Sequence, residues 1–152
     1  MRLFSPAFVF SFVEIVDFLN RLLNEQREIE MATDCCNSED KLIFACSGAA
    51  DVGAIADRAA RKLSKDGDGK MFCLAGVGGR VPPIMERTAE ASDILAIDGC
   101  SAACVRNCLE QAGFKKFKHL LVEQEGFRKG HAPASDEAIA KIAAKGRELL
   151  AS

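Results

Sequence analysis

Seven cysteines lie in this chain of 152 residues, and all of them fall between Cys35 and Cys108. The thiolate of cysteine is both a nucleophile and a ligand for soft metal ions. Disulfide frameworks are typical of small secreted domains with too little core, whereas a chain of this length can bury a core of its own. No small-residue cleavage site follows the early apolar stretch, so we expect a reducing, cytoplasmic setting. The odd number of cysteines therefore favours metal binding or thiol chemistry over structural bridges.

Three of the cysteines stand at or just beyond the ends of apolar runs that we predict to be strands. Cys46 ends the first run, Cys73 lies near the end of the second, and Cys100 comes two residues after the third. The carboxyl ends of parallel strands meet at one edge of an open sheet, where α/β proteins bind ligands. The predicted topology therefore gathers these thiols from distant parts of the sequence.

Two further cysteines follow in a segment that we predict to be helical, at residues 101–111. Cys104 comes four residues after Cys100, so we expect both thiols on one helix face, near an amino terminus whose dipole stabilises thiolates. Four thiolates suit zinc first and an iron–sulfur cluster second. Cys108 lies two turns along the helix, away from the edge, and is expected to be a packing residue.

Weaker candidates for a site at this edge of the sheet are Cys35, Cys36, the two histidines and Asp98. Cys35 and Cys36 precede the first strand, and at about 3.3 Å per residue they would lie about 20 Å from its carboxyl end, too far for primary ligands. His131 follows the fourth predicted strand and is a candidate extra ligand or proton carrier. His119, inside that strand, is predicted to be structural. Asp98 is predicted to be a turn residue, or an acceptor for N–H groups of the loop.

The elements that must position these residues alternate between strand and helix. Four short apolar runs are typical of strands buried on both faces, at residues 41–46, 70–74, 93–98 and 117–122. Helical periodicity appears between and after them, at residues 52–63, 82–91, 101–111 and from 135 onward. This alternation predicts an α/β three-layer sandwich with a four-stranded, mainly parallel, Rossmann-like sheet.

The chain carries 20 basic and 22 acidic residues, so we expect neither nucleic acid nor an anionic membrane surface as a partner. The apolar run at residues 3–13 falls short of the roughly 20 residues that span a bilayer. We interpret residues 1–30 as an N-terminal extension, either an amphipathic helix or the product of a start assigned upstream of Met31. Its apolar stripe would need cover from the domain or from a second copy in a homodimer. Residues 31–152 are expected to form a single metal-binding domain.

Several motifs resemble the DGC-domain family, which takes its name from an Asp-Gly-Cys sequence, here Asp98-Gly99-Cys100. Cys46-Ser-Gly-Ala-Ala-Asp-Val-Gly and Cys73-Leu-Ala-Gly-Val-Gly-Gly are similar to the family as well, and the likeness covers residues 42–130. The family is described as zinc-binding from its shared cysteines and has no established activity. The resemblance implies four metal ligands, namely Cys46, Cys73, Cys100 and Cys104.

Three functions remain open at this point. The leading interpretation is a zinc-binding protein in metal or sulfur handling. The second is a thiol-dependent oxidoreductase or transferase, in which one cysteine attacks and another resolves the intermediate. The third is a structural zinc site in an interaction module. The sequence alone does not decide whether the chain is an enzyme.

Overall fold

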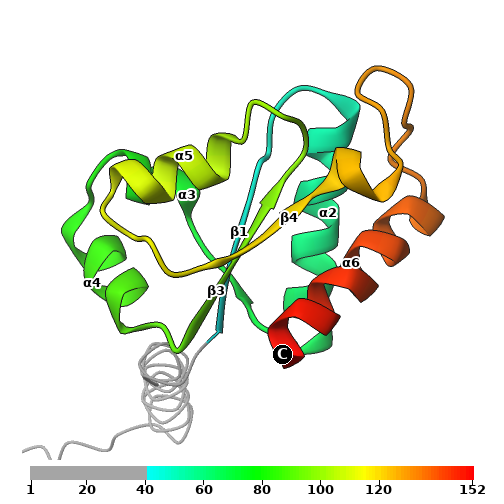
Figure 1. Cartoon of the computed structure of the whole chain (residues 1–152). Helices are drawn as coiled ribbons and strands as arrows, with labels where there is room; N and C mark the ends of the chain where they lie inside the picture. Colours follow the sequence, from blue (N-terminus) through cyan, green and yellow to red (C-terminus); the bar gives the residue numbers. More distant parts are fainter. Residues whose placement is uncertain (1–40) are drawn as a thin grey trace, which may run out of the picture. The chain divides into compact units, whose positions relative to one another are not determined.

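The fold is built on a four-stranded sheet whose strands all run parallel (Figure 1). The computed structural model describes residues 41–152. The spatial order of the strands is β2-β1-β3-β4, and their bounds are β1 Lys41–Ala45, β2 Lys70–Met71, β3 Asp93–Asp98 and β4 Lys118–Leu121. The predicted α/β fold with a four-stranded parallel sheet is confirmed.

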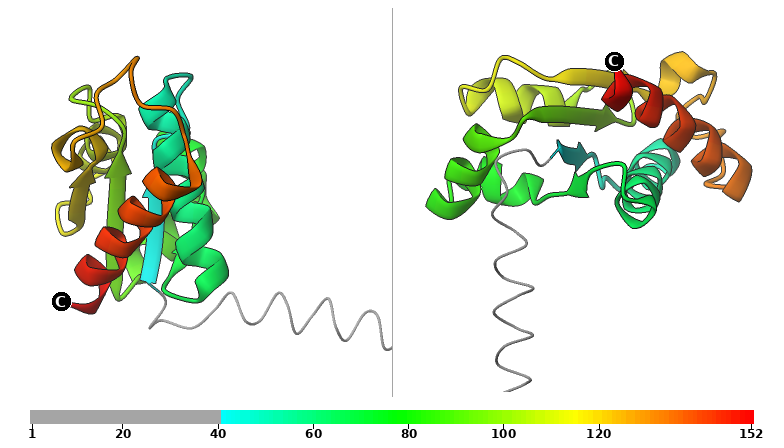
Figure 2. Two further views of the ribbon diagram at one scale, coloured as in Figure 1. Left: turned by 90° about the vertical axis from the view of Figure 1, so that its right-hand side faces the viewer. Right: turned by 90° about the horizontal axis from the view of Figure 1, so that it is seen from below.

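Helices cover both faces of the sheet, giving the three layers seen end-on in Figure 2. One face carries α2 (Asp51–Asp66) and α6 (Asp136–Ala151). The other carries α3 (Leu74–Gly78), α4 (Pro82–Glu90) and α5 (Cys104–Gln111). A short 3-10 turn, η2 (Val122–Glu125), follows β4.

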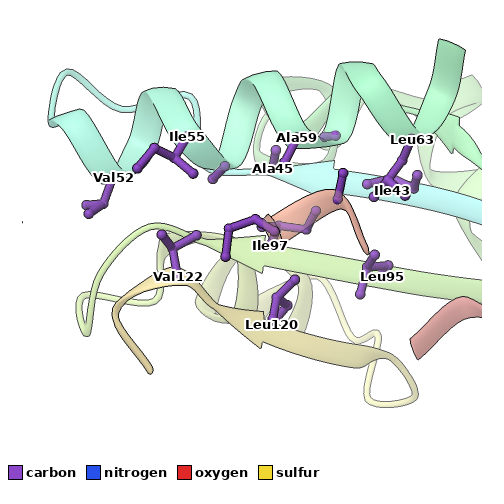
Figure 3. Packing of buried hydrophobic residues seen from close by; sticks show 14 of the residues in the cluster. Ile43, Ala45, Val52, Ile55, Ala59, Leu63, Leu95, Ile97, Leu120 and Val122 are labelled. Carbon is purple, nitrogen blue, oxygen red and sulfur yellow. The ribbon is translucent and has the colours of Figure 1, made fainter. Parts of the chain in front are cut away.

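Alternating residues of the strands point into two separate hydrophobic cores, one on each face of the sheet. In β1, Ile43 points to the α2–α6 side, while Leu42 and Phe44 point to the α3–α5 side. Figure 3 shows the α2–α6 core, where Ile43 and Ile97 from the sheet face residues of α2 such as Ile55. Burying each large side chain of this kind stabilises the fold by about 1.5–3 kcal/mol. Both faces are apolar, which explains why the strands appear as continuous apolar runs in the sequence.

Local sequence signals explain where three of the helices begin or end. Gly67 ends α2 in the left-handed conformation with φ of 82°, which costs glycine little. Ser135 caps α6, because its side chain accepts a hydrogen bond from Ala138 N. Pro82 occupies the first turn of α4, where its missing N–H is not needed.

Three boundaries differ from the prediction. The strand predicted at 70–74 ends at Met71, and Cys73 is instead the N-cap of the short helix α3. The strand predicted at 117–122 ends at Leu121, before η2. The helix predicted at 101–111 begins at Cys104, because Ala103 adopts a left-handed conformation with φ of 48° and cannot lie inside a right-handed helix.

Nothing in residues 41–152 forms a helix long and apolar enough to cross a membrane. The predicted extension at residues 1–30, the start at Met31, and both Cys35 and Cys36 lie outside the described residues.

Candidate thiol site at the carboxyl edge of the sheet

The strand order reverses between β1 and β3, which places a switch point between these two central strands. From β1 the chain adds β2 on one side, and then β3 and β4 on the other. In open parallel sheets ligands bind in the crevice beyond the carboxyl ends of the strands at such a point. Cys46 directly follows β1, and its backbone N–H donates to Ile97 O of β3 at 2.9 Å. Cys100 comes two residues after β3, so the two cysteines flank the switch point.

Backbone packing on the first turn of α2 fixes both cysteine loops. A Cβ added at Gly99 would lie 2.9 Å from Gly53 N and from the carbonyl carbon of Val52. A Cβ at Gly53 would lie 2.7 Å from Gly48 O. The loop after Cys46 and the loop before Cys100 thus both approach α2 more closely than a side chain would allow. Glycine at these positions lets the two thiols come from neighbouring loops.

Asp98 fixes the start of α5. Its carboxylate is fully buried and accepts hydrogen bonds from Val105 N at 2.8 Å and Arg106 N at 3.0 Å. These are the second and third residues of α5, the N–H groups that an N-cap side chain usually satisfies. Ala103 stands at the N-cap and has no side chain for that purpose. Asp98 therefore supplies the cap from β3 and holds Cys104 at the first position of the helix.

His119 completes the surroundings of Asp98. Its Nε2 lies 2.9 Å from Asp98 Oδ2, and its side chain is 23% exposed while that of Asp98 is 1% exposed. The structural role predicted for His119 is therefore to contact the carboxylate that caps α5. The predicted role of Asp98 as an acceptor is refined, because its donors are helix N–H groups rather than loop ones. No periodicity in the sequence indicates either contact.

The prediction that Cys100 and Cys104 share a helix face is wrong. Cys100 lies before α5, in a turn closed by the hydrogen bond from Ala103 N to Cys100 O at 3.0 Å. The cap from Asp98 and the left-handed Ala103 fix the beginning of the helix at Cys104. A turn, rather than one helical face, therefore relates the two thiols.

Three of the four predicted ligands nevertheless lie in one neighbourhood. Desolvation raises the pKa of the Cys104 thiol, and negative charge on Cys46, Asp98 and Cys100 raises this pKa further. A side-chain hydrogen bond with Cys46 acts in the same direction. Cys104 is exposed, and Cys46 and Cys100 are half-buried. The Cys104 thiol therefore lies close enough to Cys46 and Cys100 for their charge to raise its pKa.

Cys73 and Cys108 have other contacts. The Cys73 sulfur is exposed and accepts a hydrogen bond from Gly76 N at 3.3 Å, so it caps α3. The Cys108 sulfur lies 3.8 Å from Leu74 O and packs into the α3–α5 core, where burial raises its pKa. Cys108 thus takes the packing position expected from its place in the sequence.

The cysteine sulfurs of this site are suitable ligands for a thiophilic metal ion. They are not, however, arranged as a complete set of ligands around one ion. Within residues 41–152 no group of three His, Cys, Asp or Glu side chains is arranged to hold a metal ion. Zinc or an iron–sulfur cluster would require the loops that bear Cys46, Cys100 and Cys104 to draw their sulfurs together.

The loop between η2 and α6 lies against the same edge, which the sequence did not indicate. Asp51, the first residue of α2, accepts hydrogen bonds from Gly130 N at 2.9 Å and Ala132 N at 2.8 Å. We call these two hydrogen bonds the Asp51 clamp. They hold the loop so that Lys129 Nζ lies 3.8 Å from Cys100 Sγ. Positive charge on His131 helps to lower the pKa of Asp51. This candidate ligand therefore lies near the carboxylate of the clamp.

We expect the Asp51 clamp to release the loop in acid. The N–H groups of Gly130 and Ala132 hold the pKa of Asp51 below its usual value of 3.8. A depressed carboxylate pKa contributes stability above the pKa of the unfolded state, and this contribution is lost as the pH falls through the folded-state value. Asp51→Asn should therefore speed amide hydrogen exchange at Gly130 and Ala132 at neutral pH.

The matched control for Asp51→Asn is Glu148→Gln, which removes a carboxylate from a surface pair with Lys145. Exchange at the two loop amides should stay as in the unchanged chain. Equal exchange in Asp51→Asn and in the unchanged chain would contradict the clamp.

An open parallel α/β sheet with paired thiols at its switch point defines the class of this protein. The chain belongs to the DGC domain family, whose model matches residues 42–145 and so includes Cys46, Cys73, Cys100 and Cys104. It is 38% identical over 88 residues to the anaerobic and virulence modulator AnvM of Pseudomonas aeruginosa, covering 58% of this chain and 67% of that protein. No solved structure matches the chain. The resemblance to the DGC domain is confirmed.

Proposed function

We propose that this protein binds zinc through Cys46, Cys100 and Cys104, with Cys73 as the fourth sulfur, and acts in metal or sulfur handling. The observation that carries the proposal is the placement of the first three cysteines beyond the carboxyl ends of β1 and β3, where charge on Cys46 and Cys100 raises the pKa of Cys104. Thiolates that lie together repel one another, and a divalent cation removes that repulsion. Zinc takes four sulfur ligands in tetrahedral geometry at about 2.3 Å.

The residues around the thiols support the proposal by limiting how far each loop must move. The close approach of Gly48 and Gly99 to α2 fixes the loops of Cys46 and Cys100, and Asp98 fixes Cys104. Buried acceptors and packing of this kind orient ligands in known metal sites. Cys73 would have to leave its contact with Gly76 N, so we expect it to bind last and to contribute least.

A regulatory setting is compatible with this proposal. The relative from Pseudomonas aeruginosa is named an anaerobic and virulence modulator. A thiol site that gains or loses metal offers one way to couple cellular conditions to such modulation, and we expect it to operate in a reducing cytoplasm.

The test is elemental analysis of the full chain purified without oxygen, together with its visible spectrum. We expect bound zinc, no visible absorption, and loss of the metal in Cys46→Ser and Cys104→Ser because serine is a poor zinc ligand. Both variants should stay folded, since the two cores do not depend on the metal.

Cys108→Ser is the matched control, because Cys108 lies on the same helix as Cys104 but contacts Leu74 O in the core. It should keep its zinc. Iron with visible absorption in the unchanged chain would favour the iron–sulfur alternative. Full zinc retention by both Cys46→Ser and Cys104→Ser would refute the site.

A further inference from the structure

A pocket of about 690 Å³ lies at the amino-terminal ends of β3 and β4. One wall is the end of α4 with the turn into β3, and the other is residues 113–118, which lead from α5 into β4. Figure 1 shows both connections on the side of the sheet that carries α4 and α5. β3 starts at this pocket and ends near the thiols, about 17 Å away at about 3.3 Å per residue. The pocket is therefore separate from the proposed metal site.

The end of α5 holds the wall formed by residues 113–118. Gly113 is left-handed with φ of 93°, and its N–H donates to Glu110 O at 3.0 Å. The next N–H, of Phe114, donates to Leu109 O at 3.0 Å. These two hydrogen bonds form a Schellman motif, in which the residue after the glycine packs back on the helix. Phe114 and Leu109 pack together in the α3–α5 core, so this wall of the pocket is preformed.

The lining of the pocket combines aromatic rings with positive charge. Phe114 and Phe117 line the pocket, and both are half-buried against the α3–α5 core. Lys115 and Lys116 lie between them in the sequence and are exposed. Small-molecule sites have volumes of about 300–1,000 Å³ and place a few polar groups among apolar ones. The size and the composition of this pocket agree with that description.

An ion pair leaves the pocket with an excess of positive charge. Asp93 brings a carboxylate to the lining, and Lys118 Nζ donates a hydrogen bond to its Oδ2. The charges of these two residues cancel. Among residues 41–152, neither Lys115 nor Lys116 has an acidic partner. The charge of these two lysines therefore remains to attract an anion.

We propose that this pocket binds a small organic anion that carries an aromatic ring. The anionic group, a carboxylate or a phosphate ester, pairs with Lys115 and Lys116, whose flexible ammonium groups accept either geometry. The ring packs against Phe114 and Phe117, because aromatic rings associate through offset or edge contacts. The site uses none of the cysteines, so it goes beyond metal binding and does not depend on it.

NMR titration of the isotope-labelled full chain tests this site. The probes are indoleacetate, an aromatic carboxylate, and adenosine monophosphate, an aromatic phosphate ester. We expect at least one probe to shift the amide signals of residues 113–118 in a saturable way, with a Kd below about 1 mM. The amide signals of Cys46 and Cys104 should not move. The probe that binds more tightly identifies the anionic group.

Fragments of the two probes separate the contribution of the charge from that of the ring. Acetate and inorganic phosphate lack the ring, while indole and adenosine lack the charge. Each fragment should bind at least about tenfold more weakly than the probe from which it derives. Added salt should weaken the binding of the probes, because it screens exposed charges. Equal binding of a probe and its uncharged fragment would contradict the role of the lysines.

A double variant, Lys115→Gln with Lys116→Gln, removes the charge from the wall of the pocket. Probe binding should weaken by at least about tenfold. The matched control is Lys62→Gln with Lys65→Gln, which removes the same charge from exposed positions of α2, on the opposite face of the sheet. This control should bind as the unchanged chain does. Equal weakening in both double variants, shifts only outside residues 113–118, or no saturable binding of either probe would overturn the proposal.

Discussion

Replacing Asp98 by alanine will lower the free energy of unfolding by about 3 kcal/mol, one of the two largest effects that the structure predicts for a single substitution. The buried carboxylate accepts from Val105 N and Arg106 N and contacts His119. Alanine leaves two N–H groups at the start of α5 without an acceptor, and buried unsatisfied donors are costly. Urea unfolding followed by circular dichroism measures the loss, and the thermal midpoint should fall by about 10 °C.

Asp93→Ala is the matched control, because Asp93 begins the same strand that Asp98 ends. Its carboxylate pairs with Lys118, and the two side chains are 22% and 29% exposed; solvent-screened pairs of this kind contribute about 0–1 kcal/mol. A loss in Asp98→Ala no larger than in this control would contradict the capping role. Asp98→Ala should also reduce zinc content, since Cys104 is the residue whose position the cap holds.

Gly99→Ala should be the second strongly destabilising change, at about 2–3 kcal/mol. The added methyl would lie 2.9 Å from Gly53 N and from the carbonyl carbon of Val52. These are backbone atoms of the first turn of α2, so they cannot rotate away as a flexible side chain would. The loop must shift instead, and Cys100 with it. The same urea unfolding measures the change.

Gly78→Ala provides the comparison for Gly99→Ala. A Cβ at Gly78 would lie 3.5 Å from Cys108 Sγ, an ordinary contact at an exposed position of α3. This variant should be as stable as the unchanged chain or slightly more stable, because alanine favours a helix. If Gly99→Ala unfolds at the same urea concentration as Gly78→Ala, the close packing of the Asp98-Gly99-Cys100 loop on α2 is wrong.

The Asp-Gly-Cys motif thus has a separate physical role at each position. Asp98 caps α5, Gly99 allows the loop to pack on α2, and Cys100 places a thiol beside the switch point. The resemblance to the family identifies the motif, but the reason for the first two residues lies in contacts between elements. These contacts explain why a change at either residue should affect both folding and the thiol site.

The sheet and most helices could be predicted because their signal is local. Apolar runs buried on both faces specify β1 and β3, and helical periodicity specifies α2 and α6. Parallel topology then brings Cys46 and Cys100 to one edge without any knowledge of contacts. Confirmation of the sheet therefore supports the placement of these two thiols.

The start of α5 and the position of the loop before α6 depend instead on interactions between residues far apart in the sequence. The start of α5 is set by Asp98 in β3, so helical periodicity alone extended that helix too far. The loop that brings Lys129 to Cys100 is held by Asp51, which lies 79 residues from Gly130. Neither contact has a periodic pattern, and only the folded chain brings these groups together.

The central claim is that the thiols at the switch point bind a metal ion together, and cobalt titration of the reduced full chain tests it most directly. Cobalt replaces zinc in thiolate sites and reports sulfur ligands through its absorption. We predict thiolate-to-cobalt absorption that saturates at one ion per chain, is displaced by zinc, and is lost in Cys104→Ser but kept in Cys108→Ser. Cobalt that binds without thiolate absorption, or with equal absorption in the two variants, would contradict the account.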